Sequence, residues 1–348
     1  MARLSTQRFV VRVLLSLPTP ILRIMSGGGV IYKGGRTLDP RLQLLTAQAA
    51  KSPGMENLTP EEARKASAAG LAALTASLAA GVRAEPLTVP GAEGEIAARV
   101  YRPDIQDSTA PILVYAHMGG GVIGDLDTCE AFCSLLAKTV GCPVISVDYR
   151  LAPEHRFPAG LDDVLATYRW AREHAVRFGA QPGKAAIGGD SMGGHFAAII
   201  AQDLRRAGEP QPEYQLLIYP CVDVASETPS MSTYAQAFPL SRATMDWFMG
   251  HYMGPQDDPA NLRLSPMRAP DLTGLAPAII ATAGFDPLVD QGETYAKALK
   301  AAGVRIEYRR YDSLAHGFTA FTGAIPAADA ACRQIAELVR DSLKERTT

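Results

Sequence analysis

Apolar residues recur at helical spacing in the first part of this chain, and no strand is predicted before residue 86. Helices are expected over residues 40–50 and 60–80. The glycine-rich segment 26–35 lacks the Lys-Ser/Thr continuation of a phosphate-binding loop, so a flexible loop is expected there. We interpret residues 1–85 as an N-terminal helical cap segment.

From residue 86 onward, short apolar runs alternate with amphipathic stretches of helical length. Strands are expected at 86–89, 95–101, 111–116, 143–147, 184–187, 214–219, 277–283 and 305–311. Helices are expected at 130–139, 160–178, 195–206, 291–302 and 327–344. The first two strands suit an antiparallel pair, and the later alternation implies a mostly parallel sheet covered by helices on both faces. The sequence therefore predicts an α/β domain over residues 86–348.

This alternation pauses between residues 222 and 270, where methionine and aromatic residues are frequent. Ligands of open α/β sheets bind outside the carboxyl ends of the strands. We therefore expect residues 222–270 to form a helical cap insertion over that edge, with most of its apolar side chains as its own core. Phe238, Leu240 and Trp247 are the residues of this insertion that we expect in a substrate pocket.

The composition excludes several classes of protein. The 348 residues are 47% hydrophobic and 20% charged, and a formal net charge of −2 gives no indication of a nucleic-acid partner. The five cysteines are an odd number and lack the paired spacing of a zinc site. We expect reduced thiols, no bound metal and a cytoplasmic location.

Residues 9–25 form a mostly apolar run near the start of the chain. Arg12, Pro18, Pro20 and Arg23 interrupt it, so it suits neither the core of a signal peptide nor a membrane span. A helix packed over a groove is expected, and weak contact with a membrane surface is left open.

The pattern Gly-x-Ser-x-Gly occurs once in a context that gives it meaning, around Ser191. A short apolar strand precedes it and an amphipathic helix follows it, which is the strand-turn-helix setting of a nucleophile elbow. An ordinary strand-to-helix turn with a solvated serine could match the same Gly-x-Ser-x-Gly pattern. Other parts of the chain decide between these interpretations.

A serine nucleophile needs a base and a group that orients the base. Of the six histidines, His316 directly follows the last predicted strand, and Asp286 follows the strand before it. Asp290 is an alternative acid four residues further on, at the expected start of a helix. The chain order Ser191, Asp286, His316 is that of an α/β hydrolase.

A second glycine-rich turn, His117 to Gly121, directly follows the strand expected at 111–116. Glycines let a backbone lie against a substrate and present its N–H groups to a developing oxyanion. Because it follows a predicted strand upstream of the elbow, this turn is a candidate oxyanion loop.

These motifs together resemble the hormone-sensitive-lipase family of α/β hydrolases, which includes the bacterial family IV esterases. The similarity runs from about Glu85 to the C-terminus and includes Asp148 to Glu154, Ser265-Pro266, Asp286-Pro287-Leu288 and His316-Gly317-Phe318. The resemblance implies an α/β-hydrolase fold and a triad of Ser191, Asp286 and His316. It also implies that the backbone N–H groups of Gly119, Gly120 and Met192 are the oxyanion donors.

The chain departs from the family pattern at three positions. Met118 stands at the family's first loop glycine, Gly121 at its aromatic position, and Met192 at the usual elbow alanine. We expect Met118, Gly121 and Asp190 to border the substrate pocket. In the family, His117 braces the loop and is not the base.

A serine carboxylesterase acting on short- to medium-chain acyl esters is the expected function, with a small-molecule ester substrate and no cofactor. A non-catalytic small-molecule-binding protein on this fold and a membrane-surface lipase are the alternatives. A homodimer is left open.

Overall fold

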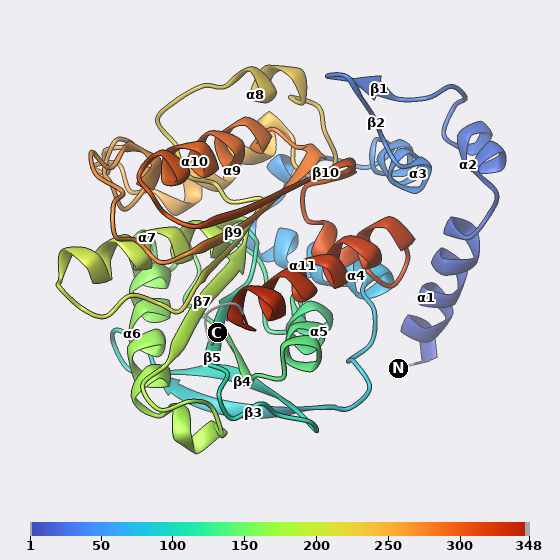
Figure 1. The fold of residues 1–348 in the computed structure, drawn as a ribbon. Helices are drawn as coiled ribbons and strands as arrows, with labels where there is room; N and C mark the ends of the chain where they lie inside the picture. The colour runs from blue at the N-terminus through green and yellow to red at the C-terminus, as the bar shows by residue number, and fades with distance from the viewer. Residues whose placement is uncertain (1, 345–348) are drawn as a thin grey trace.

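The structure, a computed structural model, describes residues 2–344, so Met1 and residues 345–348 lie outside it. An eight-stranded sheet with the strand order β10-β9-β8-β7-β5-β6-β4-β3 runs through the molecule (Figure 1). Its strands are β3 Val82–Pro90, β4 Glu95–Pro103, β5 Ile112–Ala116, β6 Val144–Val147, β7 Ala185–Asp190, β8 Gln215–Ile218, β9 Ala278–Phe285 and β10 Ile306–Ala315. All eight strands expected from the sequence are therefore present.

The six strands from β10 to β6 pair in parallel, whereas β4 pairs antiparallel with β6 and β3 antiparallel with β4. Strands β5 to β9 are buried along their whole length, because helices cover both faces. This burial explains why they appear in the sequence as continuous apolar runs. The mostly parallel sheet predicted by the sequence is confirmed.

Two layers of helices cover the sheet. In Figure 1, helices α6, α7 and α10 lie on one side of it and α5 and α11 on the other. Successive β5 residues alternate between the two cores, since Val114 packs in one hydrophobic cluster and Tyr115 in the other. These helices are α5 Glu130–Val140, α6 Ala159–Glu173, α7 Met192–Arg206, α10 Val289–Ala301 and α11 Pro326–Lys344.

The N-terminal segment is helical, with two differences from expectation. It contains α1 Ala2–Leu15, α2 Thr19–Met25, β1 Tyr32–Lys33, β2 Arg36–Thr37, α3 Pro40–Ala49 and α4 Pro60–Leu74. The short β1–β2 hairpin overlaps the segment expected to be only a flexible loop. Helix α4 ends six residues before the expected residue 80, because Thr75 donates to the Ala320 carbonyl at 2.8 Å and the chain continues in an extended conformation.

Between β8 and β9 the chain forms α8 Pro229–Thr233, α9 Arg242–Tyr252 and a short 3-10 turn, Pro266–Arg268. This segment, in which the alternation of the sequence pauses, contains these three short helical elements joined by loops. Over the described residues, no helix combines the length and the apolar character that crossing a bilayer requires.

Candidate active site

Ser191 stands alone between the end of β7 and the start of α7. Its backbone has φ 53° and ψ −113°, a conformation that residues with a side chain rarely adopt. The Ser191 N–H donates to the Ile218 carbonyl at 2.8 Å, and its carbonyl accepts from the His195 N–H at 2.9 Å. A Cβ on Gly193 would lie 1.9 Å from the Ala116 carbonyl oxygen, so only glycine fits there. The geometry is that of a nucleophile elbow.

Three side chains from three strand ends meet at this turn. His316 Nε2 lies 2.8 Å from Ser191 Oγ, and His316 Nδ1 lies 2.7 Å from Asp286 Oδ2. All three residues are less than 9% exposed. With an ionised Asp286, which can only accept, His316 Nδ1 carries the proton and the Nε2 lone pair faces the serine hydroxyl. Ser191 and His316 are 125 positions apart in the sequence, and Asp286 and His316 are 30 apart. The parallel sheet brings all three together.

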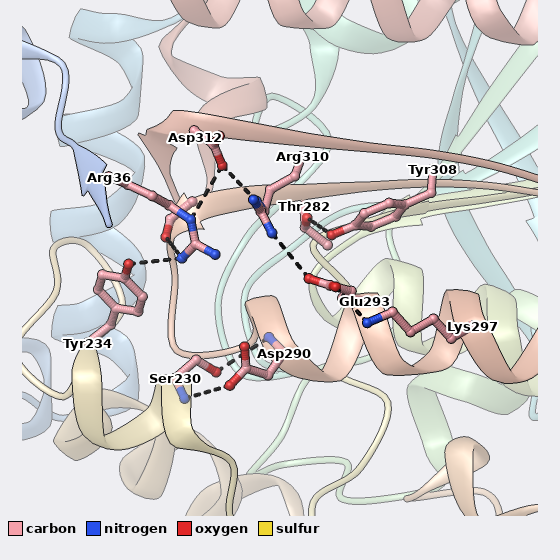
Figure 2. Close-up of polar contacts among 11 residues, drawn as sticks. Arg36, Ser230, Tyr234, Thr282, Asp290, Glu293, Lys297, Tyr308, Arg310 and Asp312 are labelled. Carbon is pink, nitrogen blue, oxygen red and sulfur yellow. Dashed lines mark hydrogen bonds and ion pairs between the residues drawn. The ribbon is translucent and has the colours of Figure 1, made fainter. Parts of the chain in front are cut away.

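Asp290, the alternative acid, forms its hydrogen bond with a different part of the chain. Asp290 Oδ2 accepts from the backbone N–H of Ser230 at 2.8 Å and so fastens α10 to α8 (Figure 2). Asp286 is further fixed by the Leu288 N–H, which donates to its Oδ1 at 2.8 Å.

The turn after β5 exposes backbone donors beside the serine. Gly119, Gly120 and Gly121 have φ values of 132°, 62° and 74°. Among the hydrogen bonds of the described residues, none is donated by the N–H of Gly119 or Gly120. Met192 is the first residue of α7, so its N–H precedes the first intrahelical bond. Gly120, Ser191 and Met192 line one cavity.

This cavity lies between Ser191 and residues of the 222–270 segment, and its empty space, including the part open to solvent, is about 620 Å³. Most of its wall is apolar, and it is formed in large part by Met231, Leu240, Met245, Phe248, Met249 and Leu288. Polar side chains line another part of the wall, among them Asp223, Glu227, Arg242 and Asp246. The pocket therefore offers an apolar space next to the nucleophile.

Of the six residues expected to border the pocket, Leu240 lines this cavity, and Met118, Gly121, Asp190, Phe238 and Trp247 are not among its lining residues. Met118 lies beside Gly317, and Trp247 packs against Phe248 and His251 on α9. Phe238 belongs to the loop between α8 and α9.

Gly121 is buried, and a Cβ there would lie 2.6 Å from the Tyr252 ring, so this position faces α9 and not the cavity. Asp190 is also buried, beneath the elbow. Its Oδ2 accepts from Tyr219 Oη at 2.9 Å and from Thr319 Oγ1 at 2.7 Å. Burial raises the pKa of the Asp190 carboxyl.

Two further groups near the site have defined protonation states. His117 Nδ1 donates to its neighbour's carbonyl, that of Met118, at 2.8 Å, and burial lowers the pKa of this imidazole. This fits a bracing role for His117. Cys221 also lines the cavity, and burial raises the pKa of its thiol to about 12, so the thiol stays protonated and is a poor nucleophile.

Arg36, which the sequence pattern did not single out, joins the N-terminal hairpin to β9 and β10, the strands that directly precede Asp286 and His316. Its guanidinium donates to Tyr234 Oη at 2.9 Å and to the Gly284 carbonyl at 3.1 Å, and it pairs with Asp312 at 3.3 Å (Figure 2). Gly284 precedes Asp286 by two residues, and Asp312 precedes His316 by four. No local motif marks such a residue, because its partners lie about 200 positions or more away.

The fold and this arrangement of side chains define a class, and sequence comparison agrees: the chain belongs to the family with the α/β-hydrolase fold, which matches residues 113–320. It is 45% identical over 317 residues to the carboxylic ester hydrolase LipN of Mycobacterium tuberculosis, covering 88% of this chain and 84% of that protein. It is 41% identical over 265 residues to the carboxylesterase NlhH of the same organism, covering 74% and 83%.

A solved structure gives the same result. The ester hydrolase EH1AB1 from the metagenome of Lake Arreo, complexed with a derivative of bipyridine phosphonate, superposes with a TM-score of 0.84. Its sequence is 38% identical, and the match covers 89% of this chain and 100% of that one.

Proposed function

We propose that this protein, a serine carboxylesterase, hydrolyses short- to medium-chain acyl esters through an acyl-enzyme intermediate. The observation that carries the proposal is the continuous row of hydrogen bonds from Ser191 through His316 to Asp286, at the wall of an apolar cavity. The names of the relatives, which are esterases and carboxylic ester hydrolases, support the class of reaction.

In the proposed mechanism, Ser191 Oγ attacks the ester carbonyl carbon while His316 Nε2 takes the hydroxyl proton. The N–H groups of Gly119, Gly120 and Met192 stabilise the negative charge on the carbonyl oxygen. The tetrahedral intermediate collapses, the bond to the alcohol oxygen breaks, and His316 gives its proton to the departing alcohol. Water then attacks the acyl-enzyme with His316 as base, which releases the acid and restores the serine hydroxyl.

Asp286 holds the imidazole in the tautomer that accepts the serine proton, and it stabilises the imidazolium that forms. Each step of this mechanism uses side chains and backbone N–H groups of this chain. Among the described residues, no group of three or more His, Cys, Asp or Glu side chains is placed to hold a metal ion.

We assign residues 1–85 to an N-terminal cap segment and residues 222–270 to a cap insertion on the catalytic domain 86–348. Support comes from the insertion's contribution to the cavity wall, through Met231, Leu240 and Met245 among others. An apolar wall of this kind favours an acyl chain over a polar substituent.

The test is hydrolysis of p-nitrophenyl esters from acetyl to palmitoyl by wild type and by Ser191→Ala. We expect turnover of the shorter esters, and a fall in kcat of about 10⁴- to 10⁶-fold in the variant. A phosphonate ester should inactivate wild type and leave no adduct on Ser191→Ala by mass spectrometry. Near-normal turnover by the purified variant would overturn the assignment.

Two other interpretations predict different results in the same assay. A binding protein on this fold would bind small esters without turning them over, and the presence of the complete triad argues against it. A membrane-surface lipase would prefer emulsified long-chain esters to dissolved short ones.

A cytoplasmic location and a homodimer remain expectations. The five cysteines support the first, because each is a free thiol in the structure.

A further inference from the structure

Exposed apolar side chains gather on the N-terminal segment. Ten large hydrophobic side chains of the described residues are exposed, and eight of these lie between residues 9 and 32. Phe9 is 68% exposed and Ile24 is 76% exposed. The other two, Ile105 and Val176, are isolated in the sequence. A concentration of this kind marks an interaction surface, whereas single exposed apolar residues do not.

In Figure 1, α1 and α2 run along one edge of the molecule. Six of the eight exposed apolar side chains belong to these two helices. We call the face made by Phe9, Val10, Val13, Ile21, Ile24 and Met25 the N-terminal apolar face. The opposite faces are already occupied, since Leu15 and Leu22 are buried against the body. On α1, Arg12 reaches the Thr75 carbonyl just beyond the end of α4. The attachment of both helices therefore leaves this apolar face unpaired.

The charge of the segment is as uneven as its hydrophobicity. Residues 1–38 contain six lysine and arginine residues and no aspartate or glutamate, since the first carboxylate is that of Asp39. The whole chain has 34 basic and 36 acidic residues, so residues 39–348 carry a net charge of −8. Lys33, next to the apolar face along the chain, is exposed. Arg36 is neutralised by its ion pair with Asp312, so the cations beside the apolar side chains are Arg8, Arg12, Arg23 and Lys33, whereas the rest of the molecule has an excess of acidic residues.

We propose that the N-terminal apolar face docks the protein on the surface of anionic lipid bilayers. Exposed phenylalanine and isoleucine side chains can enter the boundary between headgroups and acyl chains, while the cations meet the lipid phosphates. An acidic remainder is repelled by the same surface, so the charge distribution orients the molecule with this face toward the lipid.

A second copy of the chain fits the face less well. A two-fold dimer places the same patch of each copy against the other, which would bring the two cationic segments together. Like charges at such a contact oppose association, whereas an anionic bilayer neutralises them.

The chain that carries the apolar face is also joined to the 222–270 segment, part of which lines the cavity. The β1–β2 hairpin follows the apolar face in the chain and contacts the cap insertion, where Tyr234 Oη donates to the Lys33 carbonyl at 3.2 Å. The lipid-binding surface is separate from the triad, so this proposal does not depend on the proposed reaction.

The experiment is flotation of the full-length protein with two kinds of vesicle, phosphatidylcholine alone and phosphatidylcholine mixed with phosphatidylglycerol. We expect binding to the anionic vesicles that weakens as salt is raised. The double variant Phe9→Ser/Ile24→Ser should bind roughly tenfold less tightly or worse, because two buried apolar groups are lost. Lys33→Gln should weaken binding about fivefold.

The chain provides a matched control, Ile105→Ser/Val176→Ser, which removes the two exposed apolar side chains outside the face. This control should bind anionic vesicles like wild type. All variants should keep wild-type turnover of a dissolved acetyl ester, which shows that they are folded. Three results would each overturn the proposal: no binding of wild type to anionic vesicles, equal loss in the control, or conversion of a dimer to a monomer by Phe9→Ser/Ile24→Ser in sedimentation without any effect on flotation.

Discussion

His316 owes its position partly to residues that do not touch the cavity. The Tyr219 ring lies against the His316 ring, with 4.7 Å between centroids, and Tyr219 itself has a positive φ of 36°. Its hydroxyl donates to Asp190, the residue before the nucleophile. A buried hydrogen bond thus connects Asp190, which directly precedes Ser191, to the ring that packs against the His316 imidazole.

Asparagine substitutions at Asp286 and Asp290 show which of the two aspartates orients His316. Asp286→Asn should lower kcat by about 10⁴-fold, because an amide stabilises the tautomer of His316 that cannot accept the serine proton. Asp290→Asn should change kcat little, since Asp290 accepts from the Ser230 backbone and not from His316. The measurement is kcat for butyryl ester in both variants, and a larger loss in Asp290→Asn would contradict the assignment.

The neighbours of Gly121 in the structure differ from those expected from the sequence. From the sequence alone, an aromatic ring at this position would narrow the pocket and select against bulky esters. In the structure a Cβ at Gly121 meets the Tyr252 ring at 2.6 Å, and φ is 74°. We therefore expect Gly121→Ala to destabilise the protein by about 1–3 kcal/mol and to slow acetyl and octanoyl esters by a similar factor.

The measurement is kcat/KM for both esters together with urea unfolding. Tyr252→Leu should relieve the steric part of the defect when it is combined with Gly121→Ala. A selective loss of the octanoyl ester alone would restore the pocket interpretation.

At the scale of elements, the alternation of apolar runs predicted the sheet well, because every strand from β5 to β9 is buried along its whole length. The proposed triad was located from the same pattern, since Ser191, Asp286 and His316 each come directly after the last residue of a strand. A residue's place relative to a strand end is a local property that sequence retains.

The cap could be predicted only in outline. Methionine and aromatic residues marked the insertion, but spacing does not distinguish a side chain that lines a cavity from one that packs inside. Met231 and Met245 line the cavity, whereas Trp247 packs on its own helix. The end of α4 and the clamp made by Arg36 depend on contacts distant in sequence, such as that of Thr75 with Ala320.

The hairpin clamp gives a prediction at this scale. Arg36→Met removes two hydrogen bonds and an ion pair from a side chain that is only 16% exposed. We expect the free energy of unfolding to fall by about 1–3 kcal/mol. We also expect kcat to fall roughly tenfold with KM little changed, because the ends of β9 and β10, which precede Asp286 and His316, lose a shared anchor.

Arg36→Lys should recover part of kcat, since it keeps one donor and the charge. Arg333→Met is the matched control, because Arg333 is 61% exposed and pairs only with Asp329 one turn away. Lower stability of Arg36→Met with unchanged kcat would mean that the hairpin is a structural attachment without influence on the triad.

At the scale of the whole molecule, two buried histidines make stability depend on pH. His195 Nδ1 donates to the Cys221 carbonyl at 2.7 Å, and its Nε2 is buried without a partner among the described residues. Burial lowers the pKa of His195 to about 4, from 6.5 for the unperturbed group. Burial lowers the pKa of His117 as well.

The pKa of His195 is lower in the folded state than in the unfolded state. At pH values well above 6.5 the imidazole is neutral in both states, so it does not change the free energy of unfolding there. As the pH falls from 6.5 toward 4, the unfolded chain binds a proton that the folded chain excludes, and stability declines. The full effect on the free energy of unfolding is about 3 kcal/mol.

The variant His195→Asn keeps a donor near the Nδ1 position and removes the titratable group. In urea unfolding at pH 7.5, 5.5 and 4.5, the advantage of wild type over His195→Asn should therefore shrink with each step toward acid. An advantage that stays constant over this range would show that the buried imidazole takes up its proton in the folded state as readily as in the unfolded one.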